Sequence, residues 1–235
     1  MNALRRYPVA AGMPPSLVLK LALALAEAGD ADAAERLFHD RFFPREEGGT
    51  SVRSVYAQVR VTSAAVLAAG GGCDVALPIL GSLSREQPGL AFTTGGLTDT
   101  LGGGSMVMQL AEIESRCGPR ESAQARWERL ARSLAADGAP LTIAIADQAR
   151  ARLGRPQTEA ERSRVEQALA AATATLESAG TSSPGLLEYA RGLLLGGLGR
   201  TAEARASLQR VFLYPDRGLS HALARVAMKQ AEGVR

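Results

Sequence analysis

Residues 17–44 read LVLKLALALAEAGDADAAERLFHDRFFP, and this stretch decides the fold. An apolar run with helical spacing extends from Leu17 to Ala28 and meets Gly29-Asp30; a second run begins at Ala31 and stops before Pro44. Glycine after the last periodic residue ends a helix, and an aspartate just beyond it can cap the next helix. Two helices joined by so short a turn form an antiparallel hairpin. Because one hairpin cannot bury its apolar faces alone, the stretch predicts a stack of hairpins.

The same order of helix, glycine turn and helix recurs along the chain. The turn glycines are Gly29, Gly71, Gly118, Gly154 and Gly199, which are 42, 47, 36 and 45 residues apart. Helical periodicity bounded by glycine and proline predicts the remaining helices at about 51–69, 74–83, 105–117, 120–136, 140–154, 158–178, 184–198 and 201–213, with a last helix at about 219–230. We expect residues 1–15 to be an irregular lead-in and residues 16–235 to form a single repeat domain.

Aligning the hairpins on their turns reveals a shared pattern of small and large residues. The second helices carry a small residue followed four positions later by a large one: Ala34 and Phe38, Ala76 and Leu80, Ala123 and Trp127, Ala204 and Leu208. Seven positions before the turn, the first helices carry Ala22, Ala64, Ala111 and Gly192, whereas the fourth hairpin carries Asp147. A small residue there lets two helices approach closely, and the large residue fills the space behind it.

This pattern resembles the tetratricopeptide repeat (TPR), which has a small residue in each helix, an aromatic residue in the second and a closing proline, near which Pro44 and Pro215 stand. The resemblance implies an all-α chain, a right-handed α-solenoid of about five TPR-like hairpins with a C-terminal capping helix. The glycine spacing departs from the regular TPR length of about 34 residues. Residues 42–49 and 89–92 are also similar to TPR tails of large bacterial proteins, in which a β-sandwich domain precedes the repeats.

The amino-acid composition and the net charge agree with a helical chain and argue against binding to nucleic acids or membranes. Aromatic residues are 4% of the chain, and no segment alternates in the manner of a half-buried strand. The net charge is only +3, and basic and acidic residues alternate along the helices, so we expect no nucleic-acid binding. No stretch approaches the ~18 apolar residues of a membrane span. Arg5-Arg6 before the first apolar run resembles a secretory signal, but Lys20 interrupts the run, so we expect a structural helix and a cytoplasmic protein.

The sequence offers little support for catalysis or for a cofactor. His39 and His221 are the only histidines and lie on different hairpins, without a metal-ligand spacing. We expect Cys73 and Cys117 to be free thiols, because adjacent helix axes lie ~8–10 Å apart, beyond the ~7 Å limit for a disulfide. The glycine clusters lack the Gly-Lys-Ser/Thr ending of a phosphate-binding loop. We therefore expect no metal, no cofactor and no enzymatic activity.

One charged cluster is a candidate for function. Residues Arg45, Glu46, Glu47, Arg53, Tyr56 and Arg60 gather charge and an aromatic ring around a Gly-Gly connector. Such a cluster can contact a ligand, or it can form an ion-pair network that holds a long loop in place. The connectors between hairpins are longer than the turns within them, and insertions in repeat arrays often border the binding side. Phe92, in the connector at 84–96, is therefore a further candidate, although these loops can also merely cover helix ends.

The TPR resemblance also implies that the first helices line a concave face. Its candidate binding residues are Met108, Gln109, Glu112, Arg116, Gln148, Arg152 and Tyr189. Such a groove suits an extended segment or a partner helix. Our leading hypothesis is a non-catalytic module that binds a peptide or partner protein, and self-association is left open. The alternative is a helical accessory or oligomerisation tail of a larger enzyme, which could act on carbohydrates, whose catalytic domain this chain lacks.

Overall fold

The computed structural model describes residues 13–43, 51–133, 138–178, 181–214 and 219–232. The described residues form eleven α-helices and three short 3-10 helices, with no β-strand, so the prediction of an all-helical chain is confirmed for them. Among the described residues, no helix is both long and apolar enough to cross a membrane. The chain divides into two compact units, residues 1–106 and 107–235, and the predicted single repeat domain stays a prediction.

The first unit contains four helices and two 3-10 turns. They are α1 (Pro15–Glu27), α2 (Ala31–Arg36), α3 (Val52–Ala69), α4 (Cys73–Ser82), η2 (Ala91–Thr93) and η3 (Thr98–Leu101). Helix α1 packs against α2 and α3, and α3 packs against α4 and both 3-10 turns. Local signals set the ends: Asp30 accepts a hydrogen bond from the Ala33 N–H, and Gly29 has a φ of 85°, which favours glycine.

Helix α2 is shorter than the sequence predicts. It ends at Arg36 rather than near Phe42, and Asp40 takes a positive φ of 54°. The Phe38 ring is 1% exposed and lies against the rings of Phe43 and Tyr56, with centroids 5.7 and 4.9 Å away. The chain leaves the helical path here, and aromatic packing stabilises the turn that replaces the last helical turn.

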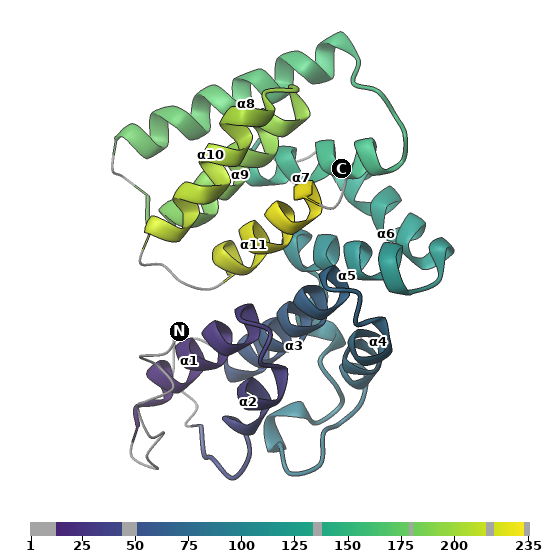
Figure 1. The fold of residues 1–235 in the computed structure, drawn as a ribbon, viewed down its shortest axis with the longest axis vertical. Helices are drawn as coiled ribbons and strands as arrows, with labels where there is room; N and C mark the ends of the chain where they lie inside the picture. Colours follow the sequence, from purple (N-terminus) through teal and green to yellow (C-terminus); the bar gives the residue numbers. More distant parts are fainter. Residues whose placement is uncertain (1–12, 44–50, 134–137, 179–180, 215–218, 233–235) are drawn as a thin grey trace. The chain divides into compact units, whose positions relative to one another are not determined.

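The second unit contains most of α5 (Gly104–Cys117), which begins in the first unit, and six further α-helices. These are α6 (Arg120–Ser133), α7 (Pro140–Arg152), α8 (Glu159–Glu177), α9 (Pro184–Gly197), α10 (Thr201–Arg210) and α11 (Leu219–Glu232), with η4 (Val211–Leu213) after α10. Helix α9 is central, because α7, α8, α10 and α11 all pack against it (Figure 1). A capping box of Thr158 and Glu161 opens α8, which gives that helix a defined start.

The small and large positions of the sequence pattern are largely buried. Ala22, Ala64 and Ala111 are fully buried, and a Cβ at Gly192 would lie 2.9 Å from the Leu208 side chain. Trp127 is 3% exposed, and its Nε1–H donates to Ser115 Oγ at 3.0 Å. Close approach of paired helices at these positions therefore depends on the small residue, as the pattern predicts.

Asp147, which occupies the small position of the fourth hairpin, is 5% exposed and lies against α9. Its Oδ1 accepts a hydrogen bond from Gln157 Nε2 at 2.7 Å, and the same amide nitrogen donates to the Gly197 carbonyl at 3.2 Å. A Cβ at position 197 would lie only 2.0 Å from Asp147 Oδ2. The carboxylate fits between α7 and α9 because residue 197 has no side chain.

The prediction for the cysteines is wrong. Neither Cys73 nor Cys117 is a free thiol, since both are disulfide-bonded. The prediction rested on the spacing between packed helix axes, which does not apply here because Cys73 is the first residue of its helix and Cys117 the last residue of its own.

Candidate functional site

In the first unit, the predicted residue Arg53 holds the connector between α4 and α5. Its guanidinium donates to the carbonyl oxygens of Phe92 (2.8 Å), Thr94 (3.3 Å) and Gly96 (2.9 Å) and pairs with Asp99 at 2.8 Å. The planar guanidinium has five N–H donors, so it can satisfy several carbonyls that a long loop leaves without partners. Arg53 thus fastens residues 92–99 to the first turn of α3.

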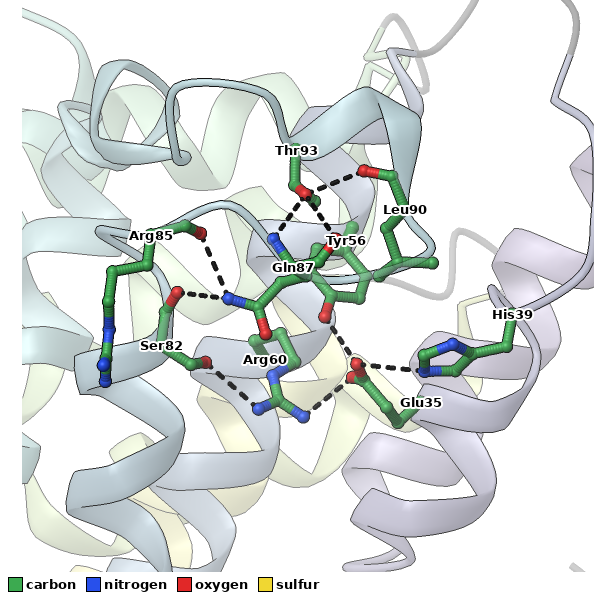
Figure 2. A network of polar contacts seen from close by, with 9 residues as sticks. All are labelled: Glu35, His39, Tyr56, Arg60, Ser82, Arg85, Gln87, Leu90 and Thr93. Carbon is green, nitrogen blue, oxygen red and sulfur yellow. Dashed lines mark hydrogen bonds and ion pairs between the residues drawn. The ribbon is translucent and has the colours of Figure 1, made fainter.

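Tyr56 and Arg60 meet at a carboxylate that the sequence did not single out. Figure 2 shows Glu35 of α2 accepting a hydrogen bond from the Tyr56 hydroxyl at 2.5 Å and from Arg60 NH1 at 2.7 Å. His39 Nε2 lies 3.7 Å from the same carboxylate. Burial, followed by the contact with Glu35, raises the pKa of the Tyr56 phenol well above its ordinary value. The phenol therefore stays protonated as a donor and is unsuited to act as a base.

The same network continues into the connector through α4. Arg60 NH2 donates to Ser82 Oγ at 3.2 Å, and Gln87 Nε2 donates to the Ser82 carbonyl at 2.7 Å. The Gln87 backbone N–H donates to Thr93 Oγ1 at 2.8 Å, and the Thr93 hydroxyl donates to the Leu90 carbonyl at 2.8 Å (Figure 2). The network therefore joins α2, α3, α4 and the connector, and its side chains face one another within the fold.

Phe92 belongs to an aromatic cluster with Phe38, Phe43 and Tyr56. Its ring centroid lies 5.4 Å from that of Tyr56, 5.9 Å from Phe43 and 6.1 Å from Phe38. Tilted and edge-on pairs at these distances are favourable. The contacts of Arg53, Tyr56, Arg60 and Phe92 are those of residues that hold a loop, one of the two roles left open by the sequence. Glu46 and Glu47 lie outside the described residues.

In the second unit, several residues of the predicted concave binding face are buried or paired with one another. Met108, Gln109 and Tyr189 are buried, and Glu112 pairs with Arg152 at 2.7 Å between α5 and α7. Burial, followed by the Glu112 charge, raises the pKa of the Tyr189 phenol. The remaining predicted residues are more accessible: Arg116 and Arg152 are exposed and Gln148 is half-buried. A ligand at this face would meet those polar side chains rather than the buried ones.

A second buried carboxylate, Glu188 of α9, is fully engaged with its neighbours. Ser207 Oγ donates to it at 2.5 Å and Arg210 Nε at 3.0 Å, and Arg191 lies 3.6 Å away. Such pairing offsets the cost of removing the charge from water. Within the described ranges, no group of three or more His, Cys, Asp or Glu side chains could hold a metal ion.

An open groove runs between α8 and the α9–α10 hairpin. Its volume is about 670 Å³. Its apolar surface comes from the half-buried Leu198 and from exposed small residues of α8 such as Ala170 and Ala174, since Leu169 and Leu195 are only 9% and 2% exposed. Charged side chains also line it: Arg162, Glu166, Glu177, Arg191, Arg200 and Glu203. Sequence analysis missed this groove, because small and apolar residues at helical spacing give the same signal whether they face a neighbouring helix or a groove.

No protein-family model, curated protein or solved structure matches this chain. Function must therefore be argued from the geometry of the chain itself.

Proposed function

We propose that this chain is a non-catalytic, TPR-like helical repeat module, and that the groove between α8 and the α9–α10 hairpin binds a helical segment of a partner protein. The observation that carries the proposal is the groove itself, in which Leu198 and exposed alanines of α8 lie among charges of both signs. Helical segments dock in such grooves through an apolar stripe with i, i+3, i+4 and i+7 spacing. The TPR-like arrangement is supported by the order of helices and by the buried small positions.

The length of the groove favours a helix of a few turns as its occupant. Its lining residues on α8 extend from Arg162 to Glu177. At a rise of about 1.5 Å per residue, those 15 steps correspond to about 22 Å of helix. The partner segment would therefore present about four turns to α8, enough for an apolar stripe to contact both the alanines of α8 and Leu198.

Charge at the rim selects the chemistry of the partner. Arg162 pairs with Glu166 at 3.4 Å, and Arg200 pairs with Glu203 at 2.6 Å, so these four charges neutralise one another. Glu177, at the C-terminal end of α8, forms no ion pair with the described residues. The proposed occupant is therefore an amphipathic helix with a lysine or arginine at the end that meets Glu177.

The test compares two substitutions on the same helix. Ala174 is exposed and lines the groove, whereas Ala171 is exposed and does not line it. Ala174→Arg should block docking, and Ala171→Arg, with the same change in charge and helix propensity, should not. The measurement is affinity capture from cell extract with quantitative mass spectrometry for the original chain and both variants.

The proposal requires proteins that are retained by the original chain and by Ala171→Arg but lost with Ala174→Arg. Identical retention by both variants would remove the groove as the binding surface. Light scattering on the purified chain adds a second readout. If the chain self-associates and only Ala174→Arg abolishes this, the groove takes a second copy instead of a partner protein.

A further inference from the structure

A second cavity lies between α6, α7 and α8, with a volume of about 160 Å³. This is well above the roughly 10–15 Å³ that one water molecule needs and below the ~300 Å³ at which sites for drug-sized ligands begin. It has room for a group of only a few heavy atoms. Five of its lining residues are ionisable: Arg132, Asp147, Arg150, Glu161 and Arg164.

Arg150 lines this cavity, but its guanidinium is already engaged or buried. Its NH1 pairs with Glu161 at 2.8 Å, and its NH2 lies 3.4 Å from the Pro156 carbonyl oxygen. Its Nε atom is buried and has no hydrogen-bond partner. Because that atom is sealed from solvent, the donors that the cavity offers to a ligand belong to its other arginines.

The other two arginines leave the cavity with an excess of positive charge. Arg132 and Arg164 are exposed, so they lie where the cavity meets solvent, and neither forms an ion pair with the described residues. Glu161 is already paired with Arg150. Guanidinium groups bind carboxylate and phosphate oxygens well, because their N–H donors match the spacing of those oxygens.

Asp147 is the one carboxylate that opposes an anion in the cavity. Gln157 already occupies its Oδ1 with a hydrogen bond of 2.7 Å. Burial raises the pKa of Asp147 above its ordinary value. Because Glu161 and Arg150 pair with each other, the two guanidiniums of Arg132 and Arg164 face the one remaining carboxylate.

We propose that this cavity binds a small oxyanion, either inorganic phosphate or the carboxylate of a small acid, through the guanidiniums of Arg132 and Arg164. The residues that line it differ from those of the α8–α10 groove, so the site is separate from the proposed docking surface.

The test is calorimetric titration of the full chain at low ionic strength, with sodium phosphate in one series and sodium acetate in another. We expect saturable binding of one anion per chain in at least one series. Replacing both Arg132 and Arg164 with alanine should weaken it by about tenfold or more, because charge-assisted hydrogen bonds are lost. Both arginines are exposed, so the double variant should remain folded, as circular dichroism would verify.

Arg162→Ala is the matched control, since it removes one positive charge from α8 at an exposed position outside the cavity. The single variant Arg164→Ala should weaken binding several-fold, whereas Arg162→Ala should leave it within about twofold, as expected for the screened effect of a distant exposed charge.

Binding of phosphate alone, of acetate alone or of both would support the oxyanion site. The result would also show whether the site accepts phosphate, a carboxylate or either. Absence of binding in both series overturns the proposal. Equal losses for Arg162→Ala and Arg164→Ala also overturn it, because binding would then follow net charge rather than the cavity.

Discussion

Trp127 illustrates how a single residue ties two helices together. The ring fills the large-residue position of α6, while its Nε1–H reaches back to Ser115 of α5 at 3.0 Å. The Ser115 hydroxyl in turn donates to the Ala111 carbonyl at 2.7 Å. An indole is tolerated in a core when its N–H finds a partner, and here the partner comes from the facing helix.

Trp127→Ala should lower the free energy of unfolding by about 3–5 kcal/mol, because it leaves a large cavity in the core of the second unit. Trp127→Phe keeps an aromatic ring but loses the hydrogen bond, so its cost should be smaller. Chemical denaturation followed by circular dichroism measures both. A loss of less than about 1 kcal/mol for the alanine variant would show that the ring does not fill the hairpin.

Asp147 gives stability a distinct dependence on pH. Burial raises its pKa above the ordinary value of 3.8, so the folded state holds more protons than the unfolded state between the two pKa values. Stability contributed by this residue therefore falls as pH rises through that window. Asp147→Asn, which keeps an acceptor for Gln157, removes the effect. Its stability relative to the original chain should increase from about pH 4 upward, as measured by denaturant unfolding at several pH values. A constant difference across that range would contradict the assignment.

At the scale of elements, the sequence predicts helix positions well and contacts between distant segments poorly. The ends of α3, α7, α8 and α9 fall within about two residues of the prediction, because glycine, proline and capping residues act locally. Helix α5 begins at Gly104, one residue before the predicted Ser105. Helix α2 ends early because aromatic packing, which periodicity does not report, competes with the helix.

In the candidate site, too, the sequence predicts local features but not the contacts between distant residues. The charged and aromatic cluster around Arg53, Tyr56 and Arg60 is visible in the sequence, but its partner Glu35 is not, since nothing local connects residues more than twenty positions apart. The three carbonyl oxygens that Arg53 binds belong to the backbone of the connector. Backbone acceptors carry no residue identity, so no sequence pattern points to them.

Arg53 also makes the connector testable by proteolysis. Trypsin cleaves after exposed arginines, and Arg85 lies exposed in the connector. Arg53→Ala frees the carbonyls of residues 92–96, so cleavage after Arg85 should become several-fold faster, because local opening controls access. Arg36→Ala is the control, since it removes an exposed arginine of α2 that forms no ion pair with the described residues. Equal cleavage rates in both variants would show that Arg53 does not restrain the loop.

At the scale of the whole chain, both units are built from helices alone within the described ranges. The second unit has a continuous core that includes Trp127, Ile143, Val165, Tyr189 and Leu223, contributed by five different helices. Helices distant in the sequence therefore share one apolar core in this unit.

Far-ultraviolet circular dichroism of the full chain should accordingly show a strongly helical spectrum with little sheet. The expectation follows from helical periodicity in every apolar segment of the sequence and from the helices of the described residues. A substantial sheet signal would be incompatible with this fold.

The contact between Gly197 and Asp147 constrains how this protein can change over evolutionary time. A methyl group at position 197 would lie 2.0 Å from Asp147 Oδ2, so a side chain arises there most readily after residue 147 has become small. The reverse order passes through an intermediate in which the carboxylate leaves its hydrogen bond with Gln157 or two helices move apart. Among descendants of this sequence, alanine at position 197 should therefore accompany alanine or glycine at position 147. The substitution at position 147 should come first.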